Sequence, residues 1–308
     1  MKIIVVGPGA MGCLFAAHLA KKNEVVLLDK HPKRADSIRQ HGIRIEGISG
    51  KWSAKVEALV DSKTVEGAEL ILICVKAYDT KAAIESIRAA IGESTVVLTL
   101  QNGVGNIEII GEMIGHERVI GGVTNQGATL LGDGRIRHAG KGETVIGRID
   151  GKIPAQMRSI REAFNQVKLE TRISRDIKGL LWSKLIINVG INALTAITRL
   201  NNGRLVEFEG TRQIMGKAVT EAVRVAKRKR IKLLYDDPLS KVEAVCEATA
   251  TNVASMLQDA LKKKKTEISF INGVIAREGQ SLGIPTPVNS VLVELVKTIE
   301  ESYALRVG

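Results

Sequence analysis

The sequence predicts a doubly wound α/β domain over residues 1–172 and an all-α domain over residues 173–308. The first reason is an apolar strand pattern at 2–6 that runs directly into a glycine-rich turn and an apolar helical pattern. The second is a pair of apolar runs, at 70–75 and 95–100, that enclose a helical segment, as in parallel βαβ units. The third is that the chain beyond Ser174 shows only helical periodicity.

Composition and charge limit the function classes. Hydrophobic residues make up 44% and charged residues 25% of the chain, which is ordinary for a globular enzyme. The N-terminus has neither a basic leader region nor a small-residue cleavage site, so we expect a cytoplasmic protein. Three scattered cysteines exclude a disulfide framework and give no metal-ligand spacing. The net charge of +12 suits anionic partners, but the basic runs at 227–230 and 262–265 contain no aromatic residues, so we expect no nucleic-acid partner.

The glycine-rich turn has the pattern G-x-G-x-x-G between a strand and a helix, which is the setting of a Rossmann-type dinucleotide site. Gly7 allows the tight turn, Gly9 lets a pyrophosphate approach the backbone, and Gly12 lets helix and strand pack closely. The anion would lie at the helix N-terminus. The complete motif is Gly7, Pro8, Gly9, Ala10, Met11 and Gly12.

The residues after the second strand, at 24–28, leave the choice of dinucleotide open. Asp29 suits the ribose 2′-hydroxyl of NAD and would repel a 2′-phosphate. The cations that follow, Lys30, Lys33 and Arg34 with His31 between them, suit the 2′-phosphate of NADP. The sequence therefore predicts a nicotinamide dinucleotide, NADP or NAD.

The remaining elements of the α/β domain follow in order. Because parallel sheets bind ligands at the carboxyl ends of their strands, Lys76 and Asn102 are expected beside the cofactor. Glycine-containing turns separate short alternating segments at 129–131, 135–138 and 144–146, and we expect these to be antiparallel strands that finish the sheet. A helix at about 154–166 and a last strand to about 172 complete the domain.

The all-α domain is expected to contain helices at about 175–197, 211–231, 238–261, 267–280 and 288–303. A dinucleotide domain followed by a helical domain implies a cleft in which a small-molecule substrate would meet the nicotinamide. Apolar helical faces would also allow a homodimer. Asn252 and Ser255, three residues apart, are expected on one helical face, where contacts between helices are the simplest explanation of both.

Residues 179–198 form the most apolar helical stretch, and Lys184 is its only charged residue. Asn188 and Asn192 follow at i+4 and i+8, so the three polar side chains form one stripe on a helix. A membrane span is disfavoured because this stripe would face hydrocarbon. On the stripe alone, a structural lysine that reaches the surface is a better explanation than a catalytic one. All five histidines lie in the first half of the chain, so a proton donor from the second domain must be another residue, and Lys184 is the leading candidate.

Six segments of the chain match, in order, the motifs of a known enzyme family. They are GPGAMG at 7–12, VKAYDT at 75–80, LQNGVGN at 100–106, WSKLIINVGINALTAI at 182–197, NVASMLQD at 252–259 and TEISFING at 266–273. Through them, nearly the whole chain resembles the ketopantoate reductase (2-dehydropantoate 2-reductase) family. The resemblance implies reduction of 2-dehydropantoate to (R)-pantoate with NADPH, on the way to pantothenate and coenzyme A.

The resemblance also implies roles for single residues. Lys184 would be the catalytic proton donor, and Lys30 falls where the family commonly has an arginine for the 2′-phosphate. The implied substrate ligands are Asn102, Lys184, Asn188, Asn192, Asn202 and Ser255, with Asn252 close by. The implied cofactor contacts are the segment Gly7 to Gly12, Lys30, Lys76, Asn102, Ala128 and Glu267.

Two alternatives remain at the level of sequence. One is another NAD(P)-dependent reductase of similar architecture that acts on a different 2-oxo or hydroxy acid, or on an opine. The other is a regulator that senses a dinucleotide or binds nucleic acid through its positive charge and has no turnover. A regulator, however, has no need of Lys184 on an otherwise apolar helix.

Overall fold

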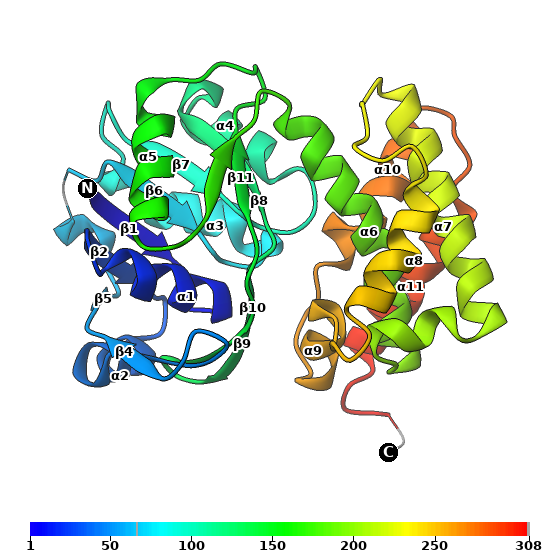
Figure 1. The fold of residues 1–308 in the computed structure, drawn as a ribbon, viewed down its shortest axis with the longest axis horizontal. Coiled ribbons are helices and arrows are strands. Elements are labelled where there is room, and N and C mark those ends of the chain that lie inside the picture. The colour runs from blue at the N-terminus through cyan, green and yellow to red at the C-terminus, as the bar shows by residue number, and fades with distance from the viewer. Residues whose placement is uncertain (66, 307–308) are drawn as a thin grey trace. The chain divides into compact units, whose positions relative to one another are not determined.

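The computed structural model describes residues 1–65 and 67–306, which form two compact units (Figure 1). Unit 1 comprises Met1–Gln101 and Asn106–Ile177, and unit 2 comprises the short segment Asn102–Gly105 and the chain from Lys178 on. Unit 1 is an α/β unit built on a mainly parallel sheet, and unit 2 is helical. The predicted fold class is therefore confirmed.

The main sheet of unit 1 has eight strands in the order β12-β11-β8-β7-β6-β1-β2-β5. Neighbouring strands are parallel except β8 and β11, which are antiparallel. The order runs outward in both directions from β1 and β6, as in a doubly wound sheet. The strands are β1 Lys2–Val6, β2 Glu24–Leu28, β5 Glu57–Leu59, β6 Leu70–Ile73, β7 Val96–Thr99, β8 Val119–Thr124, β11 Thr144–Gly147 and β12 Thr171–Ile173.

The central strands are mainly apolar because both faces of this sheet are covered. Ile3 and Val5 of β1 face a core that includes helices α1 (Ala10–Leu19) and α5 (Ala155–Gln166), while Ile4, on the opposite face, is equally buried. Helices α3 (Thr80–Ser86) and α4 (Asn106–Ile114) pack against each other, and α4 contacts β8. Helix α2 (Pro32–His41) contacts the edge strand β5.

A second sheet corrects the prediction for the glycine-rich hairpins. Strands β9 (Gly127–Gly132) and β10 (Arg135–Gly140) do not finish the main sheet but join β3 (Ile43–Gly47) and β4 (Trp52–Ala54) in a four-stranded sheet of order β4-β3-β10-β9. Of the three predicted strands, only β11 belongs to the main sheet. The reason is burial: Arg135 and Arg137 of β10 are exposed while Ile136 and His138 are buried, which suits a sheet covered on one face by α1.

Unit 2 packs its helices around one apolar core. The helix predicted at 238–261 is in fact two helices, because backbone groups between them form hydrogen bonds with another element instead of continuing the helix. In that break the carbonyls of Ala250 and Asn252 accept hydrogen bonds from Gly203 and Asn202. The elements are α6 Ile177–Thr198, η5 Asn202–Val206, α7 Glu209–Arg228, α8 Pro238–Ala248, α9 Ser255–Leu261, η6 Ile268–Phe270, α10 Asn272–Ser281 and α11 Pro287–Glu301, where η marks a 3-10 helix.

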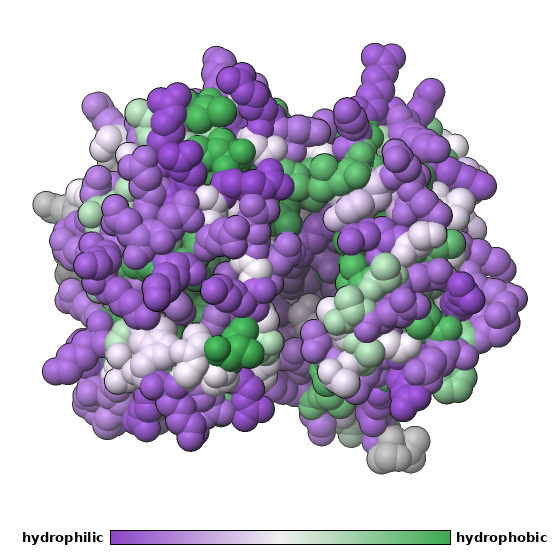
Figure 2. Space-filling view, viewed as in Figure 1, coloured by the Kyte–Doolittle hydropathy of each residue, from purple (hydrophilic) through white to green (hydrophobic). Residues whose placement is uncertain are grey.

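Helix α6 is the central helix of this core. It is long and apolar enough to cross a membrane by composition, but 72% of its most apolar window is buried inside the protein. Residues such as Leu185, Val189 and Leu194 join the core of unit 2, which accounts for the apolar composition of the helix. On the face shown in Figure 2, hydrophilic residues predominate and apolar residues lie in small patches.

Candidate active site

The glycine turn of unit 1 leaves room for a ligand at one glycine only. Gly7 has φ +101°, and a Cβ atom there would lie 2.8 Å from Val75 Cγ1. A Cβ atom on Gly12 would lie 1.9 Å from the carbonyl oxygen of Gly7, so helix and turn are in close contact. A Cβ atom on Gly9 would meet its nearest protein atom, the Cys74 oxygen, only at 4.0 Å. Gly9 is also the N-cap of α1, so the turn has the open surface that a pyrophosphate requires.

The other residues of the motif complete this surface. Pro8 is buried, and its carbonyl oxygen is 3.5 Å from the Cys13 thiol, which donates to it. Ala10 and Met11 are the first two residues of α1 and are partly exposed beside Gly9. The local geometry of the motif therefore fits a dinucleotide.

Charged side chains gather after β2, where the ribose of a dinucleotide is expected. Asp29 is 3% exposed, and its carboxylate accepts hydrogen bonds from Arg34 Nε at 2.5 Å and Arg34 Nη2 at 2.6 Å. The backbone N–H of His31 donates to the same carboxylate at 3.0 Å. Lys30 is exposed, and its ammonium lies 3.6 Å from the carboxylate of Asp79. Of the cations expected here from the sequence, Arg34 is therefore paired with Asp29 and Lys30 with Asp79.

A hydrogen-bond network that the sequence did not reveal joins the ends of β6 and β7. Gln101 Nε2 donates to the Val75 carbonyl and to Thr80 Oγ1, both at 2.9 Å, and Gln101 Oε1 accepts from Thr99 Oγ1 at 2.9 Å. The segment fixed in this way contains Lys76, the N-cap of the η2 turn Ala77–Asp79. Gln101 directly precedes Asn102 in the chain. Its place between a strand and an Asn-Gly pair was the available sequence signal.

Lys184 is partly buried on α6, within the core region of unit 2. Burial lowers the pKa of its ammonium from 10.5 to about 8, because desolvation disfavours the charged form, and the carboxylate of Glu267 opposes part of this shift. Glu267 is 6% exposed and precedes the η6 turn. At neutral pH Lys184 is therefore mostly protonated yet close enough to its pKa to give up a proton, as a general acid must.

Two of the candidate asparagines carry buried polar atoms that the described residues do not satisfy, and Asn272 of α10, which is not a candidate, carries a third. Asn192 Nδ2 and Asn202 Oδ1 have no hydrogen-bond partner among the residues that the structure describes. Leaving such an atom unpaired costs about 1–3 kcal/mol, so each is a candidate for a bond to a ligand. Asn192 continues the stripe of Lys184 and the partly buried Asn188 on α6, while Asn202 Nδ2 donates to Thr249 Oγ1 at 2.9 Å.

Asn252 and Ser255 do not lie on one helical face, which corrects the expectation from their spacing. Asn252 lies in the break between α8 and α9, and Ser255 is the first residue of α9. The backbone carbonyl of Asn252 accepts the N–H of Asn202 at 3.1 Å, so this loop and the start of η5 are joined.

The candidate residues thus fall into two groups. In unit 1, the glycine turn, Lys30 and Lys76 follow the carboxyl ends of β1, β2 and β6. Ala128 differs, because it lies on β9 in the second sheet, opposite His138. In unit 2, Lys184 is electrostatically coupled to Glu267. Asn102 is part of the short segment that clusters with unit 2, next to a backbone bond from Val104 to Phe270.

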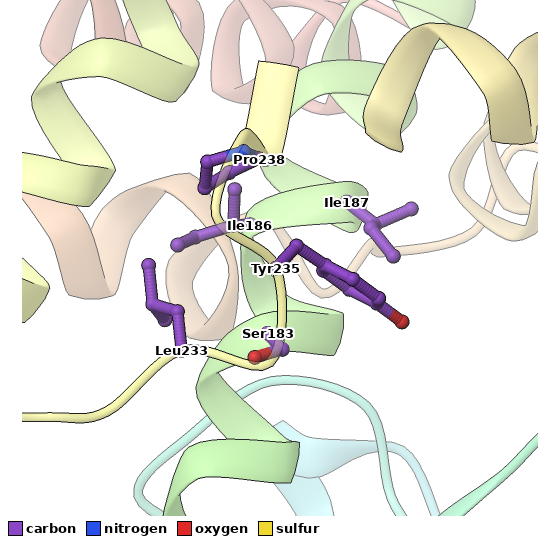
Figure 3. A pocket seen from close by; sticks show the side chains of 6 residues that line it. All are labelled: Ser183, Ile186, Ile187, Leu233, Tyr235 and Pro238. Atoms are coloured by element: carbon purple, nitrogen blue, oxygen red, sulfur yellow. The ribbon is translucent and has the colours of Figure 1, made fainter. Parts of the chain in front are cut away.

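A surface depression on α6 is separate from these candidates. It is shallow and is lined by Ser183, Ile186, Ile187, Leu233, Tyr235 and Pro238 (Figure 3). Ser183 Oγ accepts the backbone N–H of Leu234 at 2.9 Å, so this side chain holds the loop before α8. The depression is mainly apolar and contains none of the candidate catalytic or binding residues.

Comparisons with known proteins point to one family. The model "Ketopantoate reductase PanE/ApbA" matches residues 3–151, and "Ketopantoate reductase PanE/ApbA C terminal" matches residues 176–300. The 2-dehydropantoate 2-reductase of Halobacterium salinarum is 33% identical over 299 residues, which cover 96% of this chain and 98% of the relative. The structure of a PanE/ApbA family ketopantoate reductase from Ralstonia eutropha is 35% identical, with a TM-score of 0.92 and coverage of 99% of this chain and 100% of the other. A structure of D-mandelate dehydrogenase with NADH and anilino(oxo)acetate is 28% identical, with a TM-score of 0.91 and the same coverage.

Proposed function

This chain belongs to the ketopantoate reductase family, and we propose that it reduces ketopantoate to pantoate with NADPH, using Lys184 as the general acid. It is accordingly an NAD(P)H-dependent oxidoreductase of pantothenate and coenzyme A biosynthesis. The proposal assigns cofactor binding to residues 1–172 and substrate binding and proton donation to residues 173–308. A cytoplasmic location and a homodimer are part of the same expectation.

The observation that carries the proposal is the environment of Lys184. Reduction of a ketone places negative charge on the carbonyl oxygen, and a donor at about 3 Å stabilises that charge and then protonates it. An ammonium with a pKa of about 8 is protonated at neutral pH and is a much stronger acid than an exposed lysine. Burial of the ammonium on α6 lowers this pKa, and the carboxylate of Glu267 offsets part of the lowering.

The remaining steps follow from the chemistry of the side chains. A bound nicotinamide dinucleotide supplies the hydride that the C2 carbonyl carbon of the substrate accepts. Asn188, Asn192, Asn202 and Ser255 are neutral, so they can bind the substrate carboxylate and hydroxyl without adding a charge that changes the pKa of Lys184. The unpaired amide atoms of Asn192 and Asn202 supply one donor and one acceptor for these groups. Asn252 would hold Asn202 in place through its backbone carbonyl.

The glycine turn, Lys30, Lys76, Ala128 and Glu267 are proposed to contact the cofactor, and Asn102 to contact cofactor and substrate. The open surface at Gly9 fits the pyrophosphate, and the cations after β2 fit a 2′-phosphate. Glu267 would then have two roles, because its carboxylate also affects the pKa of Lys184.

A second candidate is reduction of another 2-oxo acid. It is favoured by the likeness to D-mandelate dehydrogenase, which has almost the same TM-score as the ketopantoate reductase structure but a lower identity. Both candidates use the same hydride and proton transfers, so they differ only in the substrate side chain. Neither candidate requires nucleic acid or a membrane.

The test is a substrate comparison. We expect kcat/KM with NADPH to be highest for ketopantoate within a panel that includes pyruvate, 2-oxoisovalerate and benzoylformate. A higher kcat/KM for benzoylformate would mean that the substrate is an aryl 2-oxo acid and not ketopantoate. No turnover with any member, together with salt-sensitive binding of DNA or RNA, would favour the regulator instead.

A further inference from the structure

The ion pair between Asp29 and Arg34 bears on the choice between NADPH and NADH. An acidic residue at the end of the second strand normally accepts hydrogen bonds from the ribose hydroxyls of NAD, which requires an accessible carboxylate. Here the side chain of Asp29 is only 1% exposed, whereas that of Arg34 is 25% exposed. The carboxylate is therefore enclosed, and the side chain of Arg34 is the member of the pair that reaches the surface.

The bonds of Asp29 explain why its carboxylate is enclosed. Both carboxylate oxygens accept from Arg34, and one of them also accepts the backbone N–H of His31. Two parallel bonds from one guanidinium to one carboxylate fix the orientation of both groups. Arg34 uses Nε and one Nη for these bonds, so its other Nη group remains for another anion.

The pair also removes the repulsion that the sequence suggested. An unpaired carboxylate would repel a phosphate, but the charge of Asp29 is compensated by Arg34 at hydrogen-bond distance. Lys30 is exposed beside them and is shared with Asp79 at 3.6 Å, a weak surface pair that a phosphate can replace. Asp133 also acts on Arg34, but less strongly than Asp29 does. The positive side chains therefore face the surface, and the negative side chain of Asp29 lies beneath.

We propose that Asp29 and Arg34 together form the 2′-phosphate recognition element of this chain. Asp29 acts as a positioning residue that holds the guanidinium of Arg34, and Arg34 binds the phosphate with help from Lys30. The inference deepens the proposed function, because it predicts selection of NADPH over NADH through a residue that would ordinarily indicate the reverse. Helix α2 is the next element after β2 in the chain (Figure 1). The pair therefore links the end of the strand to the first turn of that helix.

The test compares ligands that differ by the 2′-phosphate alone. Four ligands are titrated by calorimetry into wild type and variants. The two pairs compared are adenosine 2′,5′-bisphosphate with adenosine 5′-monophosphate, and NADP⁺ with NAD⁺. Arg34→Met is expected to weaken binding of the phosphorylated ligands about 10- to 100-fold and to change the others less than about twofold, because a charge-assisted bond is lost. Arg34→Lys, which keeps the charge but not the paired geometry, should fall between Arg34→Met and wild type.

Asp29→Asn tests whether Asp29 positions Arg34 or binds the ribose of NAD, because the two roles predict opposite changes in affinity for NADP⁺. If Asp29 positions Arg34, the variant binds NADP⁺ about 3- to 10-fold more weakly and NAD⁺ nearly as before, because a neutral amide holds the guanidinium less well. If Asp29 instead binds the ribose of NAD, the variant gains affinity for NADP⁺ and loses it for NAD⁺, which would overturn the proposal. Equal affinity of wild type and Arg34→Met for every ligand would also overturn it, since the pair would then be only structural.

Arg39→Met is the matched control, because it removes the same charge from the last turn of α2, where Arg39 pairs with Asp36. It should leave all four affinities unchanged, and thermal unfolding of each variant checks its folding. These measurements do not depend on turnover. Preference for the 2′-phosphate without ketopantoate reduction would contradict the proposed function and leave this inference intact.

Discussion

The pH dependence of reduction tests the coupling between Lys184 and Glu267. With a pKa of about 8, Lys184 is protonated at neutral pH and loses its proton as the pH rises through 8. A general acid must be protonated, so kcat should be constant below pH 7 and fall about tenfold per pH unit above pH 8. Glu267 raises this pKa, so Glu267→Gln should lower it and move the fall in kcat to lower pH.

The size of the change in kcat caused by Glu267→Gln depends on the pH at which kcat is measured. Because Lys184 is mostly protonated at pH 7 and mostly deprotonated at pH 9, a lower pKa reduces its protonated fraction only slightly at pH 7 and in nearly full proportion to the change in its acid dissociation constant at pH 9. Steady-state kcat at saturating NADPH and ketopantoate, measured from pH 6 to 10, gives this difference. Saturation matters because Glu267 is also a proposed cofactor contact, and a change in KM must not be read as a change in kcat.

A matched variant keeps the comparison specific. Glu243→Gln removes a carboxylate of α8 that pairs with Arg212 at 2.7 Å, and it should leave the pH profile unchanged. The same apparent pKa in wild type and Glu267→Gln would refute the assignment of this coupling. A wild-type profile that stays flat to pH 9.5 would show that the proton comes from another group.

Three further predictions concern unit 1. Gly9→Ala should fold normally, because the added Cβ has space in the protein, but it should bind NADP⁺ at least about tenfold more weakly. Wild-type affinity measured by calorimetry would mean that the pyrophosphate lies elsewhere. Gln101→Leu should lower the free energy of unfolding, measured in urea, by about 1–3 kcal/mol and raise KM for NADPH, because Val75 and Thr80 lose their hydrogen-bond partner. An unchanged KM would mean that the role of Gln101 is purely structural. Burial lowers the pKa of His18 from 6.5 to about 4, so as the pH falls the unfolded state binds the proton first. The stability present above pH 6.5 is therefore lost, by up to about 3 kcal/mol, as the pH falls to 4. His18→Phe should reduce this loss in urea titrations across that range, and an identical loss in the variant would assign it to other groups.

The fold class could be predicted because its signals are local. Apolar strands such as 2–6, the glycine turn and the helical periodicity beyond Ser174 each depend on neighbouring residues in the chain. The destination of β10 could not be predicted in this way. Its pairing with β3 joins segments about ninety residues apart, and one-sided burial, visible only in the structure, explains it.

The break between α8 and α9 shows the same limit. The helical pattern continues through it, but the carbonyls of Ala250 and Asn252 are bonded to residues of η5 instead of a following helical turn. That tertiary bonding outweighs local propensity. As a result Asn252 and Ser255, which spacing placed on one face, occupy different elements.

One property of the candidate site could be predicted from residue type alone. A single lysine on an apolar helix implies a lowered pKa, and the structure gives that direction with burial as its cause. The partners of a charged side chain could not be predicted, because they depend on side-chain direction. Asp29 indicated a ribose contact by position alone, yet its carboxylate turns to Arg34. Gln101 was missed for the same reason.

The most direct test of the central claim is the Lys184→Ala variant assayed with NADPH and ketopantoate. Lys178→Ala, which removes an exposed lysine from the first turn of the same helix, is its control. We predict that Lys184→Ala binds NADP⁺ with wild-type affinity and folds normally, while its kcat falls about 10²- to 10⁴-fold and the control keeps full activity. Turnover of Lys184→Ala within a few-fold of wild type would contradict the assignment of Lys184 as the general acid.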